Sequence, residues 1–210
     1  MSTQSVLERC HPGRRAALKR DILARSLACF NDQGIEATTI EVIKAACETS
    51  VGAIYHHFGN KDGLIAELFF CALDDQAQLL NTRLSQAHDQ RSGVHAMVLS
   101  YLDWVTAEPE LARFLFQASS FVAKGPHAPV LVERNRARNQ ALHAWFSQVD
   151  DGAMLAKCSR DLLPSLIVGQ SEHYCRAWLA GRARATPQAH RLALAEAAWG
   201  AITAAAAPSP

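Results

Sequence analysis

The stretch TTIEVIKAACETSVGAIYHHFGNKDGLIAELF, residues 38–69, contains two short segments in which apolar residues recur at helical spacing. These segments are residues 40–47 and residues 51–57, and residues 48–50 separate them. A helix, a tight turn of about three or four residues and a second short helix form a helix-turn-helix unit, whose second helix fits the major groove of DNA. The spacing predicts such a unit here, although many all-α proteins contain a helix pair with a short turn.

Polar residues mark where these helices begin. Either Thr38 or Thr39 can cap the first short helix, and Thr38 with Glu41 has the spacing of a capping box. Residues 48–50 end in a hydroxyl that can cap the second short helix. Asn60 predicts the cap of a longer helix that continues to about residue 86.

Helical spacing extends through the rest of the chain. Residues 15–33 predict a first helix that braces the helix-turn-helix pair, with Phe30 as its anchor and Gly34 as its stop signal. Further helices are predicted over residues 93–106, 109–119, 129–148, 160–181 and 187–204. The predicted fold class is therefore all-α, with an N-terminal three-helix helix-turn-helix domain followed by a larger helical bundle.

The predicted domain boundary falls near Lys61, inside continuous structure rather than at a linker. The expected segments are a flexible basic N-terminal tail over residues 1–14, a helix-turn-helix domain over residues 15–61, a helical bundle over residues 62–204 and a disordered tail over residues 205–210. Six arginine and lysine residues lie between Arg9 and Arg25, opposed only by Asp21. This local basic patch, which is either a solvated face or a contact to the DNA backbone, lies in a chain of formal net charge +1.

The bulk composition is that of an ordinary globular protein, with 49% hydrophobic and 20% charged residues among 210. The six cysteines contain no CxxC pair, and neither a secretory signal nor an apolar span long enough for a membrane helix is visible. We therefore expect a cytoplasmic protein with reduced, mostly structural thiols.

Residues 15–70 resemble the N-terminal domain of the TetR family of bacterial transcriptional regulators. The residues that carry the resemblance are Thr38-Thr39, Ile43, Ser50, Gly52, Ile54-Tyr55-His56-His57-Phe58 and Asn60-Lys61-Asp62. The remainder is similar only in its helical character and length. The resemblance implies a homodimer that binds a palindromic DNA operator, with half-sites about 34–36 Å apart. It also implies a C-terminal half that dimerises and binds a small molecule, whose binding releases the operator.

The resemblance assigns two sets of DNA-binding residues. Expected contacts to phosphates come from Thr39, Tyr55, His56 or His57, and Lys61, whose side chains all donate hydrogen bonds. Expected contacts to base edges come from Thr49, Ser50, Val51 and Ala53. Because two of these four offer only apolar contacts, DNA shape is expected to carry part of the specificity. Tyr55 equally fits a core position, and which histidine faces the phosphate stays open.

Three positions depart from the family pattern. Glu48 stands in the turn where glycine is common, and Val51 stands where a basic or polar residue is common. Glu41 lies where a basic phosphate contact is frequent, so its carboxylate is expected to weaken non-specific binding unless it serves the capping box.

Metal binding and catalysis are not expected. Adjacent residues on a helix point about 100° apart, and His56-His57 have no cysteine or carboxylate at the spacing that zinc sites require. The densest other cluster, Glu172, His173 and Cys175, has the same geometric problem for a Cys–His pair. The sequence therefore predicts no catalytic residues, no metal and no cofactor.

Polar residues that interrupt apolar helix faces are the best clues to the effector pocket. The candidate ligand-binding residues, which could line an amphipathic pocket across the bundle, are Trp104, Phe114, Gln170, His173 and Tyr174. Aromatic residues at helical spacing more often belong to the core. The last two predicted helices are rich in leucine and alanine, and with the resemblance they predict a four-helix dimer interface. The expected partners are therefore double-stranded DNA, a second copy of the chain and an unidentified small molecule, with no membrane. Alternative functions are a helical scaffold whose head binds protein and an all-α enzyme acting on the pocketed molecule.

Overall fold

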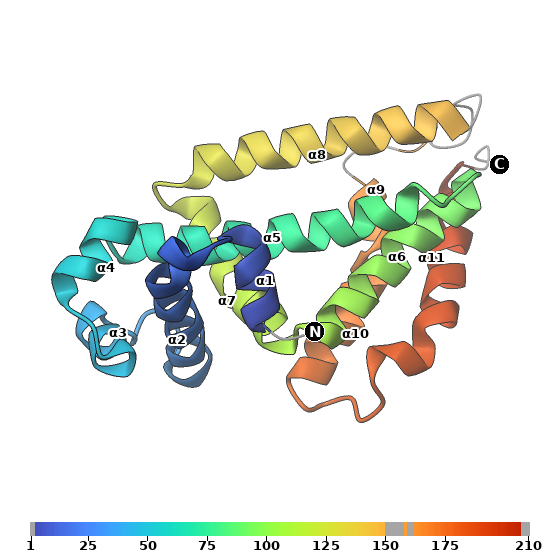
Figure 1. Cartoon of the computed structure of the whole chain (residues 1–210). Coiled ribbons are helices and arrows are strands. Elements are labelled where there is room, and N and C mark those ends of the chain that lie inside the picture. The colour runs from blue at the N-terminus through green and yellow to red at the C-terminus, as the bar shows by residue number, and fades with distance from the viewer. Residues whose placement is uncertain (1–2, 150–157, 159–161, 207–210) are drawn as a thin grey trace. The chain divides into compact units, whose positions relative to one another are not determined.

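The computed structural model describes residues 3–149, 158 and 162–206, which form helices joined by turns (Figure 1). The helices are α1 (Thr3–Cys10), α2 (Ala17–Gln33), α3 (Ile40–Cys47), α4 (Val51–Phe58), α5 (Lys61–Leu84), α6 (Gln90–Ala107), α7 (Pro109–Lys124), α8 (Ala128–Val149), α9 (Leu163–Ile167), α10 (Gly169–Leu179) and α11 (Arg191–Ala206), with 3-10 turns η1 (Arg14–Ala16) and η3 (Pro187–His190). The described residues contain no strand, which confirms the predicted all-α class. None of the helices described is long and apolar enough to cross a membrane.

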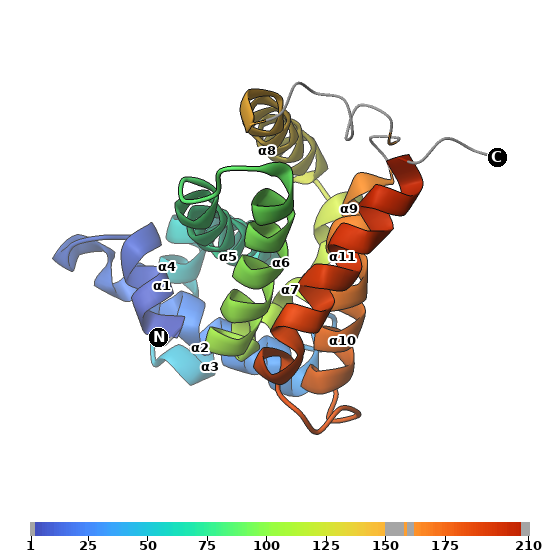
Figure 2. The same cartoon turned by 90° about the vertical axis from the view of Figure 1, so that its right-hand side faces the viewer.

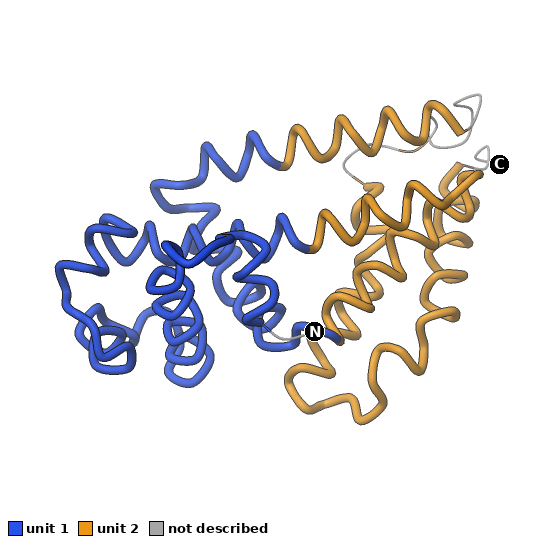
Figure 3. The backbone as a smooth tube through the Cα atoms, viewed as in Figure 1, with its two compact units in different colours: residues 1–75, 107–134 blue, residues 76–106, 135–210 orange. Residues whose placement is uncertain are grey.

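The chain divides into two compact units, each made of two segments (Figure 3). Unit 1 comprises residues 1–75 and 107–134, and unit 2 comprises residues 76–106 and 135–210. The first predicted domain, residues 15–61, therefore forms part of a larger unit. Unit 1 also includes the N-terminal residues, residues 61–75 of α5, α7 and the start of α8.

The core of unit 1 is built on α2. Its buried apolar side chains lie at helical spacing and include Ile22, Leu23 and Phe30, each with no exposed surface. The ring of Phe30 stacks on that of Phe114 from α7, with ring centroids 5.6 Å apart. Because aromatic side chains bury large apolar surfaces, this pair contributes strongly to the stability of unit 1.

The N-terminal segment differs from the predicted flexible tail. Residues 3–10 form α1, and its side chains Val6 and Leu7 are completely buried. Arg9 of this helix also donates a hydrogen bond of 2.7 Å to the Asp75 carboxylate. The expectation for residues 1–14 is therefore wrong over α1, because apolar contacts and an ion pair from distant residues order a segment that looks polar in isolation.

A disulfide between Cys10 and Cys71 also corrects the expectation of reduced thiols. These two residues lie 61 positions apart, so no CxxC spacing announces them. The other four cysteines are free and buried, as expected of structural thiols.

Unit 2 contains the end of α5, α6, the larger part of α8, and α9 to α11. Figure 2 shows α6, α10 and α11 from the side. Asp103 of α6 accepts hydrogen bonds from Arg83, from Gln188 at 2.6 Å and from Arg191 at 3.2 Å. Gly93 of α6 lies directly against the Trp145 ring of α8, because a Cβ at this position would approach it to 2.3 Å. These contacts connect segments of unit 2 that are far apart in sequence.

Most predicted helices agree with the structure to within a few residues. The helix predicted over residues 160–181 is instead two helices, α9 and α10, which separate at Val168. Residues 160–161 at its start lie outside the described residues, as do residues 207–210 of the predicted C-terminal tail. Residues 205–206 of that tail belong to α11.

Candidate nucleic-acid interface

The turn between α3 and α4 has the geometry predicted from its spacing. α3 ends at Cys47, and Glu48 adopts the left-handed conformation, with φ 49°. Glu48 is the one non-glycine residue with positive φ among those that the structure describes. Left-handed backbone is unfavourable for side chains with a Cβ, which explains why glycine suits this turn in related sequences.

The two helix starts use hydroxyl caps. Thr39 Oγ1 accepts a hydrogen bond of 3.3 Å from the Val42 amide, and Ser50 Oγ accepts one of 3.1 Å from the Ala53 amide. A hydroxyl that accepts in this way keeps its own proton to donate. Both Thr39 and Ser50 are exposed, so each hydroxyl remains able to donate to DNA.

The predicted capping box between Thr38 and Glu41 is wrong. Thr38 is buried, and its hydroxyl lies within hydrogen-bond distance of the backbone carbonyls of Cys29 and Gly34, at 3.2 and 2.8 Å. Glu41 instead lies 3.5 Å from Lys44 on the exposed face of α3. This neighbouring ammonium offsets part of the negative charge that the departure at Glu41 brings to the DNA-facing head.

One face of α4 is anchored and the opposite face is exposed. Ile54 and Phe58 are buried, whereas Tyr55 is 49% exposed and His56 is also exposed. Tyr55 therefore does not occupy a core position, which was the alternative to a phosphate contact. The pattern leaves the recognition-helix surface free while its apolar side holds the helix in unit 1.

The two histidines have different surroundings. His57 is half-buried, with its ring 5.9 Å from that of Phe58, while His56 is exposed. Their rings meet edge to face at 5.3 Å. His56 is therefore the better candidate for a phosphate contact. The described residues contain no group of three metal-binding side chains that includes either ring.

The start of α5 closes the interface. Asn60 caps this helix through its Oδ1, which accepts a hydrogen bond of 2.8 Å from the Gly63 amide, as predicted. The Lys61 ammonium donates a hydrogen bond of 3.3 Å to the Glu36 carbonyl, in the loop before Thr39. Lys61 therefore contacts the loop that precedes α3, and the other protons of its ammonium remain available to an anion.

Comparison with known proteins identifies the family of this chain. Residues 22–68 match the family described as "Bacterial regulatory proteins, tetR family". The HTH-type transcriptional repressor AcnR of Corynebacterium efficiens is 30% identical over 156 residues, which cover 64% of this chain and 78% of that protein. The chain belongs to the TetR family. Its function is that of a DNA-binding transcriptional regulator.

Other TetR-family proteins are similar over different lengths. The HTH-type transcriptional repressor KstR2 of Mycobacterium tuberculosis is 28% identical over 132 residues, covering 62% of this chain and 56% of that protein. A crystal structure of a TetR family transcription regulator from Marinobacter aquaeolei VT8 has a TM-score of 0.70, with 20% identity. The match covers 90% of this chain and 96% of the Marinobacter chain, and at 20% identity this likeness supports the fold alone.

The basic patch of this TetR-family chain is partly engaged within unit 1. Arg9 pairs with Asp75, Lys19 lies 2.5 Å from the Glu67 carboxylate, and Arg20 donates to the backbone carbonyls of His11 and Gly13. The Lys19 ammonium also lies 5.8 Å from the centre of the Phe58 ring. The start of α2 is therefore adjacent to the end of the recognition helix.

The five candidate ligand-binding residues occupy different environments. Gln170 and His173 are exposed on α10, while Tyr174 is half-buried and donates a hydrogen bond of 3.0 Å to the Ala185 carbonyl. Trp104 is buried within unit 2. Phe114 belongs to the core of unit 1, where it stacks on Phe30. Gln170 and His173 thus lie away from the interior of the unit to which they belong.

Sequence patterns missed two hydroxyls inside unit 2. Tyr101 Oη on α6 and Ser171 Oγ on α10 are buried, and neither has a hydrogen-bond partner among the described residues. Burial, together with Cys175 and Glu172 of α10, raises the pKa of Tyr101 well above its ordinary value, so it remains a neutral donor. Unsatisfied buried polar groups cost free energy, which a bound molecule can recover. No sequence signal marks them, because each sits on an ordinary helical pattern.

Lys61 gives a direct test of the phosphate contacts. We expect Lys61→Ala to weaken binding to all DNA sequences by a similar factor, about three- to tenfold, and to reduce the salt dependence by about one phosphate contact. Fluorescence anisotropy at several salt concentrations, with specific and random duplexes, measures both effects. Lys124→Ala removes the same charge from an exposed position of α7 and serves as a control. A change confined to base preference would contradict the assigned role of Lys61.

Proposed function

We propose that this TetR-family chain is a repressor that binds a palindromic operator as a homodimer and releases it when a small molecule binds unit 2. The observation that carries the DNA-binding part is the arrangement of α4, which buries Ile54 and Phe58 and leaves Tyr55 and His56 exposed. A helix held in this way presents a rigid surface to the major groove. We further propose that the protein acts in the cytoplasm, where the bacterial chromosome lies.

The proposed contacts divide into positioning and reading groups. Thr39, Tyr55, His56 and Lys61 are proposed to bind phosphates, because each has a donor at an exposed or half-exposed position. The base-reading group is proposed to be Thr49, Ser50, Val51 and Ala53, which surround the start of α4. The half-buried ring of His57 is proposed to support this helix end through Phe58.

The proposed effector site lies in unit 2. We place Tyr101 and Ser171 in it, because their buried hydroxyls lack partners, and retain Trp104 as an apolar wall. A suitable effector would carry a hydrogen-bonding group for these hydroxyls and an apolar part for the Trp104 ring. The other four candidates are weaker. Gln170 and His173 are exposed, and Phe114 belongs to the core of unit 1. The Tyr174 hydroxyl already donates to the Ala185 carbonyl.

The proposed dimer uses α10 and α11. Leu192 at the start of α11 is 66% exposed, and this helix is rich in alanine. An alanine-rich helix with an exposed leucine is suited to packing against its own copy around a two-fold axis. That symmetry would supply the two heads needed for a palindromic site.

A selection from a random pool of DNA duplexes tests the proposal. We expect a palindromic consensus whose complex weakens steeply as salt increases, by about 10³- to 10⁵-fold between 50 and 200 mM salt if six to ten phosphates are contacted. Replacing the exposed recognition residues together, as Tyr55→Ala with His56→Ala, should abolish the enrichment. Recovery of no preferred sequence by the folded wild-type protein would contradict the proposed function.

A further inference from the structure

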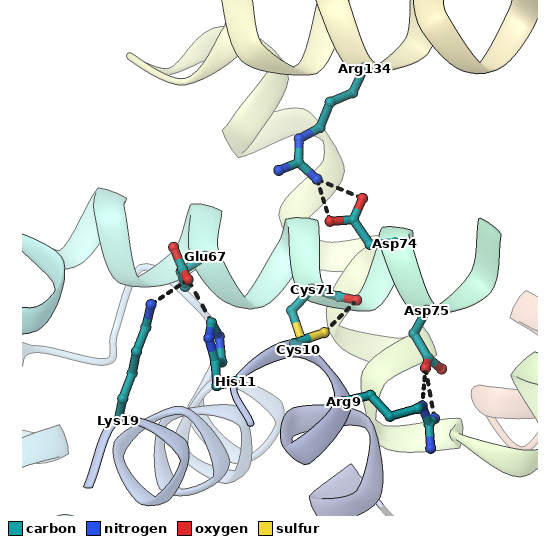
Figure 4. The surroundings of a disulfide bond; sticks show 9 residues. All are labelled: Arg9, Cys10, His11, Lys19, Glu67, Cys71, Asp74, Asp75 and Arg134. Atoms are coloured by element: carbon teal, nitrogen blue, oxygen red, sulfur yellow. Dashed lines mark hydrogen bonds and ion pairs between the residues drawn. A yellow bond between two sulfur atoms is a disulfide. The ribbon is translucent and has the colours of Figure 1, made fainter. Parts of the chain in front are cut away.

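The disulfide between Cys10 and Cys71 joins two elements at a specific place in unit 1. Cys10 is the last residue of α1, and Cys71 lies in α5, ten residues after Lys61. Their Cα atoms are 5.9 Å apart, well within the range of protein disulfides. Figure 4 shows that the sulfur pair lies between ion pairs that connect the same two parts of the chain.

The pair differs from the remaining cysteines in its access to solvent. Cys10 is half-buried, so a small oxidant can reach it, whereas Cys71 is buried. The free cysteines are all buried, and burial raises the pKa of Cys47 to about 11 and that of Cys175 to about 12. Thiol chemistry in this protein is therefore expected to concentrate at Cys10.

Charged side chains of both signs surround the linked sulfurs. Arg9 precedes Cys10, and the Lys19 ammonium lies near by against Glu67 (Figure 4). Cys71 is flanked on its own helix by the carboxylates of Glu67, Asp74 and Asp75. Because Cys10 is the more exposed of the two residues, Cys10 is suited to be the attacking thiol and Cys71 the resolving thiol.

We propose that Cys10 and Cys71 form a reversible oxidation site for hydroperoxides that controls the docking of α1 and lowers DNA affinity when oxidised. The Cys10 thiolate attacks one peroxide oxygen, which gives a sulfenic acid and releases hydroxide. The Cys71 thiol then attacks that sulfur, forming the disulfide and releasing water. In total two thiols and one H₂O₂ give one disulfide and two waters, so the two electrons pass from sulfur to peroxide. A dithiol reductant restores both thiols by exchange.

The consequence for α1 follows from its length and contacts. α1 has eight residues, and a helix this short is unstable unless it is docked. In the disulfide form it is covalently held on α5, and its Arg9 is neutralised by Asp75. In the dithiol form this covalent link is lost, and non-covalent contacts such as the burial of Val6 and Leu7 and the Arg9–Asp75 ion pair hold the helix, so it opens more readily.

An opened N-terminal segment would emerge beside the recognition helix. The start of α2 is adjacent to the end of α4, because Lys19 contacts the Phe58 ring. The released segment carries Arg9, and the exposed Arg14 and Arg15 follow it. These cations can add phosphate contacts in the reduced protein, and the disulfide withdraws Arg9 from them. This inference rests on the proposed DNA-binding function for its regulatory part, while the oxidation itself is independent of that function.

The test uses the full chain, a selected DNA duplex and hydrogen peroxide as the probe. Peroxide should lower the mass of the reduced protein by two hydrogens and yield a linked peptide pair containing Cys10 and Cys71. The oxidised protein should bind DNA about tenfold more weakly at low salt, with a salt dependence smaller by about one phosphate contact. A reducing agent should reverse both changes.

Variants separate the pair from other thiols. Cys10→Ser and Cys71→Ser should each bind like the reduced wild-type protein, with or without peroxide, and Cys29→Ala should keep the wild-type response. Absence of the linked peptides, or linked protein that binds DNA equally or more tightly, would overturn the proposal. If the reduced protein selects no DNA while the linked peptides form, the proposed function and the regulatory part fail together and the oxidation site stands.

Discussion

Phe30→Ala is expected to lower the free energy of unfolding of unit 1 by about 3–5 kcal/mol, the usual cost of removing a buried aromatic ring. Phe30 has no exposed surface, and its ring stacks on Phe114. The change leaves a cavity between α2 and α7, so the helix-turn-helix pair loses the surface that supports it. Denaturant unfolding followed by far-UV circular dichroism measures the effect.

A smaller change at the same position serves as the control. Phe30→Leu keeps most of the apolar volume and should cost about 1–2 kcal/mol less than the alanine change, because it leaves a smaller cavity. All four tryptophans of the chain lie in unit 2, so tryptophan emission without denaturant should be unchanged if that unit stays folded. Equal stability of Phe30→Ala and the wild-type protein would show that the stack contributes nothing.

Gly63→Ala is expected to reduce DNA affinity by about 100-fold, through displacement of the recognition helix. A Cβ at Gly63 would lie 2.0 Å from the backbone carbonyl oxygen of Phe58, the last residue of α4. Backbone cannot rotate away as a side chain can, so the turn between α4 and α5 must open. Overpacking of this kind typically costs about 1–3 kcal/mol, and a displaced α4 also misplaces every contact that depends on it. Anisotropy titration of a selected duplex measures the loss.

A second glycine in the same unit provides the matched control for folding. At Gly52 an added Cβ would meet only the Ser50 hydroxyl, at 3.8 Å, which is an ordinary contact. Gly52→Ala should therefore raise the stability of the head by up to about 1 kcal/mol, because alanine favours the helix. If Gly63→Ala binds DNA like the wild-type protein, the close approach to Phe58 does not fix the position of α4.

The helix-turn-helix pair was predictable because its signals are local. The start of α5 at Asn60 depends on a side chain that bonds an amide three residues later. The end of α2 depends on Gly34, whose positive φ of 84° is accessible to glycine. Signals of this kind are complete within a few residues, so sequence alone was enough. Sequence alone did not decide whether Thr38 or Thr39 caps α3. Burial of Thr38 against the Cys29 carbonyl leaves the Thr39 hydroxyl as the cap.

The remaining features depend on contacts between distant parts of the chain. The order of α1 comes from burial of Val6 and Leu7 and from the bond between Cys10 and Cys71, neither of which has a local pattern. The hydroxyl of Tyr101 was likewise unpredictable, since an unsatisfied donor is defined by the absence of a partner in space. The predicted helix divides at Val168, next to Gly169. Glycine has a low helix propensity, but a single glycine inside a helical pattern does not by itself predict a break.

The composition of unit 1 from two separated segments also limits how such proteins can recombine during evolution. A gene fusion that joined this head to a new effector domain at about residue 75 would leave α7 behind, and with it the ring that stacks on Phe30. A new partner would have to supply an equivalent aromatic or aliphatic side chain from its own second half. For this protein we therefore expect a new DNA specificity to arise more readily by substitution on the exposed face of α4 than by exchange of the whole head.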